Sequence, residues 1–130
     1  MKKIVLAAIV CMSVILGGCK EKNVSTKYSI GNLESYSSST DWATLENYLS
    51  STVTYNKIVT FENTSLSLND QEALQYYNDQ LKKLDTTYIC SLLKGPDYLV
   101  YGISTLNADG TYRRIGAIRF EKDGTSNAVQ

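Results

Sequence analysis

The sequence predicts an α+β fold, in which an antiparallel sheet of about four strands is covered on one face by two helices. Residues 40–50 and 69–84 repeat apolar side chains at the spacings of three and four that a helical face requires. Residues 53–61 instead alternate apolar and polar side chains, and three further strand-like stretches follow between turn sequences. The expected order is therefore helix, strand, helix and a meander of three strands, within a single domain over residues 40–122.

The first helix is expected over residues 40–50, where Thr40 or Asp41 can cap the free amides of the first turn. Its apolar face consists of Trp42, Leu45 and Leu49. The strand over residues 53–61 follows, because four large apolar side chains alternate along it and therefore share one face of a sheet. These are Val53, Tyr55, Val59 and Phe61.

The second helix is expected over residues 69–84. Asn69 is expected to cap it, and Glu72 stands three residues later, where its side chain can reach back to the cap in a capping box. The apolar face is formed by Leu74, Tyr77, Leu81 and Leu84. A helix with one such face is expected to lie across the sheet.

The last three strands are expected over residues 86–93, 98–106 and 111–120. The turns between them are Lys94-Gly95-Pro96-Asp97 and Asn107-Ala108-Asp109-Gly110, the second ending in the Asp-Gly pair of a tight hairpin. Residues 123–130 are expected to be a frayed tail. This order of elements resembles the nuclear-transport-factor-like and cystatin-like folds, although no motif of either is matched.

The first 18 residues have the features of an exported leader. Lys2 and Lys3 precede an apolar run over residues 4–16, which is shorter than the roughly 20 residues of a spanning helix. The run ends in Leu16-Gly17-Gly18-Cys19. This arrangement resembles the lipobox of bacterial lipoprotein signal peptides. The resemblance implies cleavage between Gly18 and Cys19, and an anchor of two or three acyl chains on Cys19.

The same resemblance implies a lipid-anchored protein of the bacterial cell envelope. Lys20 follows the cysteine in place of the aspartate that resembles an inner-membrane retention signal, which favours the periplasmic face of the outer membrane in a Gram-negative host. Residues 19–39 are polar and serine-rich, and we expect them to form a flexible tether between the lipid and the domain. A short edge strand around residues 28–33 is the alternative.

Composition excludes several classes of function. The precursor has 13 basic and 13 acidic residues, and removal of Lys2 and Lys3 leaves a net charge of about −2, which does not favour nucleic acid. The chain has no histidine, so Ser-His-Asp and Cys-His sites and nearly all ordinary zinc sites are excluded, and no metal or cofactor is expected. With Cys19 lipidated, Cys90 has no disulfide partner and is expected to be a small buried residue.

Two patterns could indicate an enzyme. Ser91-Leu92-Leu93-Lys94 matches the S-x-x-K motif of penicillin-recognising enzymes, but it falls at a predicted strand end and is interpreted as chance. Several carboxylates could in principle form a glycosidase-like pair, although their spacing singles out no two of them. They are Glu46, Glu62, Glu72, Asp79, Asp85 and Asp97.

The most distinctive charge feature is that all three arginines lie on the last predicted strand. Strand alternation places Arg113 and Arg119 on one face and Arg114 on the other. Arginine and tyrosine are favoured in protein interfaces, so we expect a binding surface on this hairpin. Its candidate residues are Arg113, Arg119, Tyr98, Tyr101 and Tyr112. The alternative is a sheet edge protected by charge against aggregation.

These observations predict a non-enzymatic, lipid-anchored module that binds another envelope protein or an incoming protein. Its function could be to inhibit an incoming hydrolase or toxin, as an inhibitor or immunity protein does, or to exclude a mobile element. It could also be an accessory subunit of an envelope complex. One alternative is a small-molecule binder with a pocket between the helices and a curved sheet. Another is a hydrolase that uses carboxylates alone.

Overall fold

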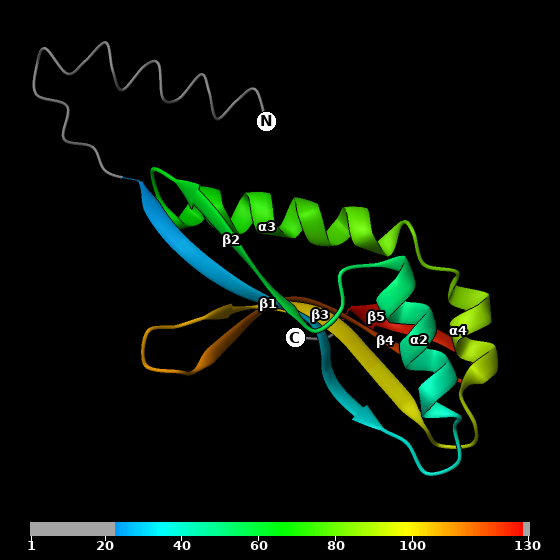
Figure 1. The fold of residues 1–130 in the computed structure, drawn as a ribbon. Coiled ribbons are helices and arrows are strands. Elements are labelled where there is room, and N and C mark those ends of the chain that lie inside the picture. Colours follow the sequence, from blue (N-terminus) through cyan, green and yellow to red (C-terminus); the bar gives the residue numbers. More distant parts are fainter. Residues whose placement is uncertain (1–22, 129–130) are drawn as a thin grey trace, which may run out of the picture.

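The computed structural model describes residues 23–128, so the predicted leader, the Gly18–Cys19 cleavage site and Cys19 itself lie outside the described residues. The α+β class is confirmed: five antiparallel strands form one sheet in the order β2-β1-β3-β4-β5, together with three helices (Figure 1). The elements are β1 (Val24–Tyr36), α2 (Trp42–Thr52), β2 (Lys57–Asn63), α3 (Leu66–Leu81), α4 (Thr86–Leu92), β3 (Tyr98–Leu106), β4 (Tyr112–Glu121) and β5 (Gly124–Ala128).

Strand β1 corrects the prediction of a flexible tether over residues 19–39. From Val24 onward this segment is a strand of 13 residues that pairs with both β2 and β3, so it is neither a tether nor an edge. Thr26, Tyr28 and Ile30 are buried at every second position. Lys27 and Ser29 between them face the other side of the sheet. The polar, serine-rich composition that suggests a tether is therefore in part that of the exposed side of a strand.

Helix α4 corrects the prediction of a strand over residues 86–93. Asp85 caps the helix by accepting a hydrogen bond from the backbone amide of Tyr88 at 3.1 Å, while Ile89 and Cys90 are buried against the sheet. A short apolar run fits a buried strand and a buried helix equally well, so periodicity alone does not separate them. The tail predicted over residues 123–130 is corrected as well, because β5 pairs with β4.

Helix α3 begins earlier than predicted. Ser65 is its cap and accepts a hydrogen bond from the amide of Leu68 at 3.2 Å. Asn69, the predicted cap, lies inside the helix and is fully buried, with its amide nitrogen 2.8 Å from the carbonyl oxygen of Val24. Glu72 does not complete a capping box and instead accepts a hydrogen bond from Asn63.

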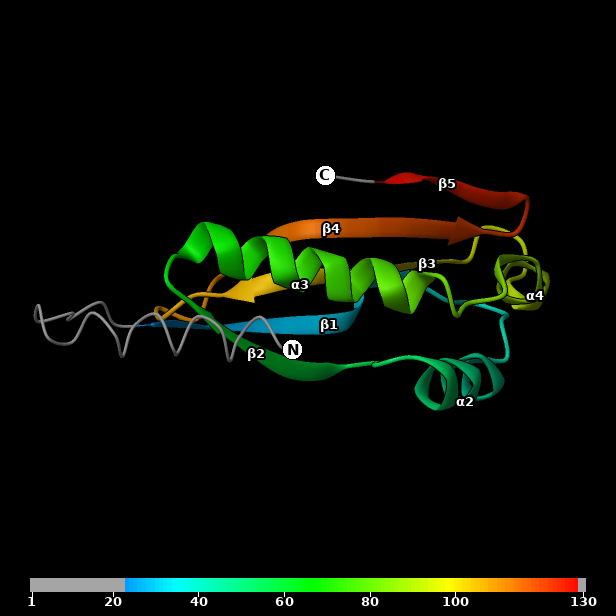
Figure 2. The same cartoon turned by 90° about the horizontal axis from the view of Figure 1, so that it is seen from above.

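The three helices pack on one face of the sheet. Figure 2 shows α3 running along the strands, with α2 and α4 beyond its C-terminal end. The core between the layers joins side chains of the sheet to side chains of all three helices, among them Tyr28, Ile30, Leu99, Tyr101 and Phe120 of the sheet and Leu45, Leu49, Tyr77 and Ile89 of the helices. We call this side the helix face. None of the three described helices combines the length and the apolar run that spanning a bilayer requires.

The opposite side of the sheet, which we call the open face, carries no helix among the described residues. The strand register assigns to it the side chains that alternate with the core residues. These include Ser29, Glu34 and Tyr36 of β1, Tyr98, Val100 and Gly102 of β3, and Arg114, Ala117 and Arg119 of β4.

Candidate binding surface

A β-bulge in β4 decides which way the arginines point. Ile103 pairs with Gly116 and the next residue of β3, Ser104, pairs with Arg114, so Ile115 is an extra residue on β4. A bulge of one residue reverses the alternation of side chains along its strand. The prediction that Arg113 and Arg119 share a face is therefore wrong. Arg119 lies on the open face together with Arg114.

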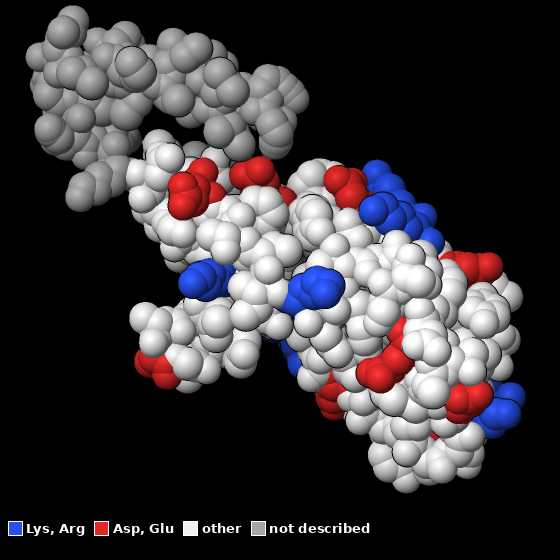
Figure 3. Space-filling model, in the orientation of Figure 1, with Lys and Arg blue, Asp and Glu red and all other residues white. Residues whose placement is uncertain are grey.

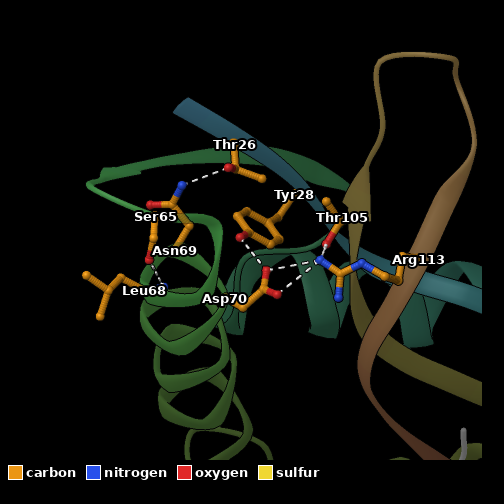
Figure 4. Close-up of polar contacts among 8 residues, drawn as sticks. All are labelled: Thr26, Tyr28, Ser65, Leu68, Asn69, Asp70, Thr105 and Arg113. Carbon is orange, nitrogen blue, oxygen red and sulfur yellow. Dashed lines mark hydrogen bonds and ion pairs between the residues drawn. The ribbon is translucent and has the colours of Figure 1, made fainter. Parts of the chain in front are cut away.

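Arg113 lies on the helix face and binds α3. One terminal nitrogen of its guanidinium lies 3.2 and 3.0 Å from the two carboxylate oxygens of Asp70, and 2.9 Å from the hydroxyl oxygen of Thr105 (Figure 4). The hydroxyl of Tyr28 donates a third hydrogen bond to Asp70 at 2.7 Å. Burial and the neighbouring carboxylate raise the pKa of Tyr28 well above its ordinary value, so this hydroxyl remains a donor. The cluster joins the start of α3 to β1, β3 and β4.

Two open grooves flank the side chain of Arg113. One lies between α3 and β4 and is lined by Leu66, Leu74 and Ile115 among others. The second lies between the start of α3 and the β3–β4 hairpin, where Leu66 and Arg113 again contribute to the lining. The guanidinium of Arg113, which both grooves share, is already paired with the carboxylate of Asp70.

A connected group of polar and aromatic side chains covers one end of the open face. Arg119 stacks over the ring of Tyr98, with its guanidinium carbon 3.7 Å from the ring centroid. The hydroxyl of Tyr98 donates to Glu34 at 3.1 Å, and this hydrogen bond raises the pKa of Tyr98 above its ordinary value. Tyr36 stacks on Tyr98 at a centroid distance of 6.4 Å, and Arg114 lies 3.9 Å from Glu34. We call these five residues the open-face cluster.

A second carboxylate holds Arg119 in place. The guanidinium Nε lies 2.6 Å from a carboxylate oxygen of Glu121 on the same strand face. Arg119 is thus held from two sides, by the carboxylate and by the ring of Tyr98. A side chain held in this way has less rotamer freedom to lose when a partner binds.

The middle of the open face is built from small residues. A Cβ atom added to Gly102 would lie 2.4 Å from the carbonyl oxygen of Gly116 and 2.6 Å from a methyl carbon of Leu33. Val100 and Ala117 beside it are almost completely buried. The longer side chains of the open-face cluster therefore lie beside a tightly packed centre.

The predicted tyrosines divide between the two faces. Tyr98 belongs to the open face, and Tyr112 is 60% exposed opposite Leu106 at the hairpin end of β4. Tyr101 is fully buried on the helix face, stacked between Tyr77 and Tyr55, so its assignment to a binding surface is wrong. Tyr98 and Tyr101 are three residues apart on one regular strand, and this spacing alone places them on opposite faces.

The residues considered for covalent chemistry have structural partners. Cys90 is buried in α4 rather than in a strand, and burial raises the pKa of its thiol, which disfavours the reactive thiolate. Ser91 donates its hydroxyl to the carbonyl oxygen of Tyr88 at 2.6 Å. Lys94 lies beyond the extended cap residue Leu93, so it does not share a helix face with Ser91. The S-x-x-K match therefore lacks the geometry that the motif requires.

Asp97 is the carboxylate with the most strongly altered environment. It accepts hydrogen bonds from the backbone amides of Ser38, Ser39 and Thr40 and from the hydroxyls of Ser38 and Thr40, at 2.6 to 3.0 Å. Burial alone would raise the pKa of Asp97, but these hydrogen bonds outweigh it and hold the pKa well below its ordinary value. Asp97 thus fastens the β1–α2 connection to the start of β3. Both carboxylate oxygens of Asp97 already accept hydrogen bonds from residues 38–40.

The pH dependence of stability tests this role. The unfolded carboxyl has a pKa of about 3.9, and the folded pKa is lower, so the carboxylate stabilises the fold above about pH 4 and this contribution is lost as the pH falls toward the folded pKa. Asp97→Asn should lower the urea midpoint at pH 7, and the gap to the wild type should narrow at pH 3. Asp79→Asn, at an exposed site on α3, is the control and should change little at either pH. A gap that stays constant or widens at pH 3 would contradict the assignment.

The structure thus brings together Tyr98, Arg119 and two residues that the sequence did not single out as site residues, Glu34 and Tyr36, with Arg114 beside them. It separates Arg113 and Tyr101 from them. Comparisons of the chain with protein-family models, with curated proteins and with solved structures found no match.

Proposed function

We propose that the chain is a lipid-anchored protein of the bacterial cell envelope whose domain is a non-enzymatic module that binds another protein through the open face. The anchoring part rests on Leu16-Gly17-Gly18-Cys19. The binding part rests on one observation. All three described helices cover the helix face, while the open-face cluster presents arginine and tyrosine side chains on the face that none of these helices covers.

The chemistry of the open-face cluster supports a protein partner. Arginine and tyrosine are enriched among the residues that contribute most to protein interfaces. Arg119 is held between Glu121 and the ring of Tyr98, so it is oriented before a partner arrives. Glu34 adds a carboxylate beside the two arginines, which favours a partner with both donors and acceptors. An inhibitor, immunity or exclusion protein, or an accessory subunit, would use such a surface.

The packing of the core favours this function over a pocket for a small molecule. The space between helices and sheet is occupied by tyrosines, and Tyr101 stacks against Tyr77 and Tyr55 there. The hydroxyl of Tyr77 donates to the carbonyl oxygen of Tyr101 at 2.8 Å. The hydroxyl of Tyr101 donates to the carbonyl oxygen of Thr54, also at 2.8 Å. These side chains fill and satisfy the region where a ligand would have to bind.

Capture of partners from envelope extracts tests the proposal. Mass spectrometry identifies the proteins that each of three tagged full-length proteins captures. These are the wild type, the double variant Arg114→Ala with Arg119→Ala, and the single variant Arg113→Ala. Because a desolvated arginine anchor contributes about 2 kcal/mol or more, the double variant should bind its partner at least roughly thirtyfold more weakly. Arg113→Ala is the matched control, since it removes the same side chain from the opposite face of the same strand. It should leave capture unchanged.

Melting temperatures of all three proteins show whether each variant is folded. A double variant that is folded and still captures every partner of the wild type would contradict a binding role for the open face. Loss of capture in Arg113→Ala alone would instead assign binding to the grooves beside α3.

A further inference from the structure

The domain begins very close to the predicted lipidation site. Only five residue steps separate Cys19 from Val24, the first residue of β1. A fully extended chain spans at most about 3.6 Å per residue, so Val24 lies within about 18 Å of the Cα atom of Cys19. Acyl chains on Cys19 place that residue at the lipid headgroups. The start of β1 is therefore confined to the layer next to the bilayer.

Exposed apolar side chains gather at this same end of the domain. Val24 is 40% exposed at the start of β1, and Leu66 and Leu68 in the first turn of α3 are 46% and 43% exposed. The first turn of α3 lies next to β1, because Asn69 in that turn donates a hydrogen bond to the carbonyl oxygen of Val24. In Figure 4 the side chain of Leu68 points away from Asp70 and from its partners Tyr28 and Arg113.

This end is held rigidly. Asn69 is fully buried, and its side-chain amide bonds to Val24 and to the hydroxyl of Thr26, at 2.8 and 2.7 Å. The amide of Asn63, the last residue of β2, bonds to the side-chain oxygen of Asn69 at 2.9 Å. Three elements are thus joined at one buried side chain, so a contact made here fixes the orientation of the whole domain.

The charge near this end has no basic excess. Lys27 of β1 and Glu62 of β2 are both exposed, on the two strands that begin and end there, and Glu72 of α3 accepts a hydrogen bond from Asn63. Acidic and basic side chains are also interspersed over the face of the domain drawn in Figure 3. A surface with exposed leucines and no basic excess favours insertion of apolar side chains among headgroups over attraction to anionic lipid.

From these observations we infer that Val24, Leu66 and Leu68 form a membrane-docking end that rests on the lipid bilayer. This inference rests on the proposed lipid anchor. The occupant is the bilayer surface, because the short chain to Cys19 brings this end, and not the other, to the headgroups. Leucine and valine side chains enter the boundary between headgroups and acyl chains, and the rigid joint at Asn69 transmits that contact to the sheet.

The docked orientation points β1 away from the bilayer. β1 runs from the docking end toward the helices α2 and α4 at the other end (Figure 1). Ten residues separate Val24 from Glu34, which is about 33 Å along a strand. Docking would therefore hold Glu34, and the open-face cluster with it, up to about 33 Å from the membrane, where a partner can reach it.

Fluorescence quenching in vesicles tests the docking end. The full-length acylated protein, with Cys90→Ala, receives one environment-sensitive label at Leu68→Cys or at Tyr36→Cys. Tyr36 is the matched control, since it is similarly exposed and lies at the far end of the strand that Val24 begins. Vesicles contain phosphatidylethanolamine, phosphatidylglycerol and a lipid with a nitroxide on its headgroup. Quenching at position 68 should exceed quenching at position 36 at least about threefold, with the same ratio in phosphatidylcholine vesicles.

The outcomes separate the anchor from the docking end. The intact mass and flotation with vesicles establish first whether Cys19 is acylated. A chain without acyl groups would overturn both the proposed anchor and this inference. An acylated chain with equal quenching at the two positions would overturn the docking end alone. If the label at position 68 is not quenched and the protein can be cross-linked into dimers through this end, the end contacts a second copy of the chain. That result would likewise overturn the docking end.

Discussion

Replacement of Tyr101 by alanine is expected to lower the free energy of unfolding by about 3–5 kcal/mol, the usual range for truncating a buried aromatic residue. Tyr101 is fully buried, and its ring centroid lies 5.7 Å from that of Tyr77 and 6.4 Å from that of Tyr55. The variant also leaves the carbonyl oxygen of Thr54 without the hydroxyl that donates to it. Urea denaturation followed by circular dichroism gives the measurement.

Tyr112→Ala is the matched control for this loss. Tyr112 is the same residue type on the neighbouring strand β4, but it is 60% exposed. Its removal should change the free energy of unfolding by less than about 0.5 kcal/mol. A third variant, Tyr101→Phe, isolates the hydroxyl and should cost about 1 kcal/mol. Equal losses for Tyr101→Ala and Tyr112→Ala would show that the assignment of Tyr101 to the core is wrong.

Gly102→Ala is expected to destabilise the domain by about 1–3 kcal/mol, although it adds a single methyl group. That group would lie 2.4 Å from a backbone oxygen of Gly116, and a backbone atom in a paired strand cannot move aside without separating β3 from β4. The nearby methyl group of Leu33 closes the space from β1.

The comparison for Gly102→Ala is Ser104→Ala, two residues along the same strand and on the same face. Ser104→Ala removes an atom, whereas Gly102→Ala adds one. Ser104→Ala should lower the free energy of unfolding by less than about 1 kcal/mol. If the two variants show the same denaturation midpoint, the close approach of β3 and β4 at Gly102 is not a constraint on the fold.

Much of the helical and β-meander structure could be predicted from local patterns. The bounds of β3 match the prediction because the turns at Gly95-Pro96 and Asp109-Gly110 delimit it. Leu45 and Leu49 of α2 are fully buried, as their spacing predicts. Three predictions were wrong, namely the tether where β1 lies, the strand where α4 lies and the frayed tail where β5 lies. The first two have a physical reason. β1 carries serines on its open face, and α4 is an apolar run too short for its periodicity to separate a helix from a strand.

The site could be predicted only in part, because its geometry depends on pairing between strands. The bulge at Ile115 reverses the side-chain alternation between Arg113 and Arg119, and only the register against Ile103 and Ser104 shows it. Glu34 reaches Tyr98 through the pairing of β1 with β3, a contact 64 residues apart in sequence. The burial of Tyr101, in contrast, follows from its spacing to Tyr98 and was available from the sequence.

The intact mass of the protein purified from bacterial membranes tests most directly whether this domain is lipid-anchored. We expect a chain that begins at Cys19 and carries a diacylglycerol on that residue, with or without a third acyl chain. Cys19→Ser should retain residues 1–18 and carry no lipid, because serine offers no thiol for the modification. A wild-type chain with an unmodified Cys19, whether or not residues 1–18 are still attached, would contradict the account.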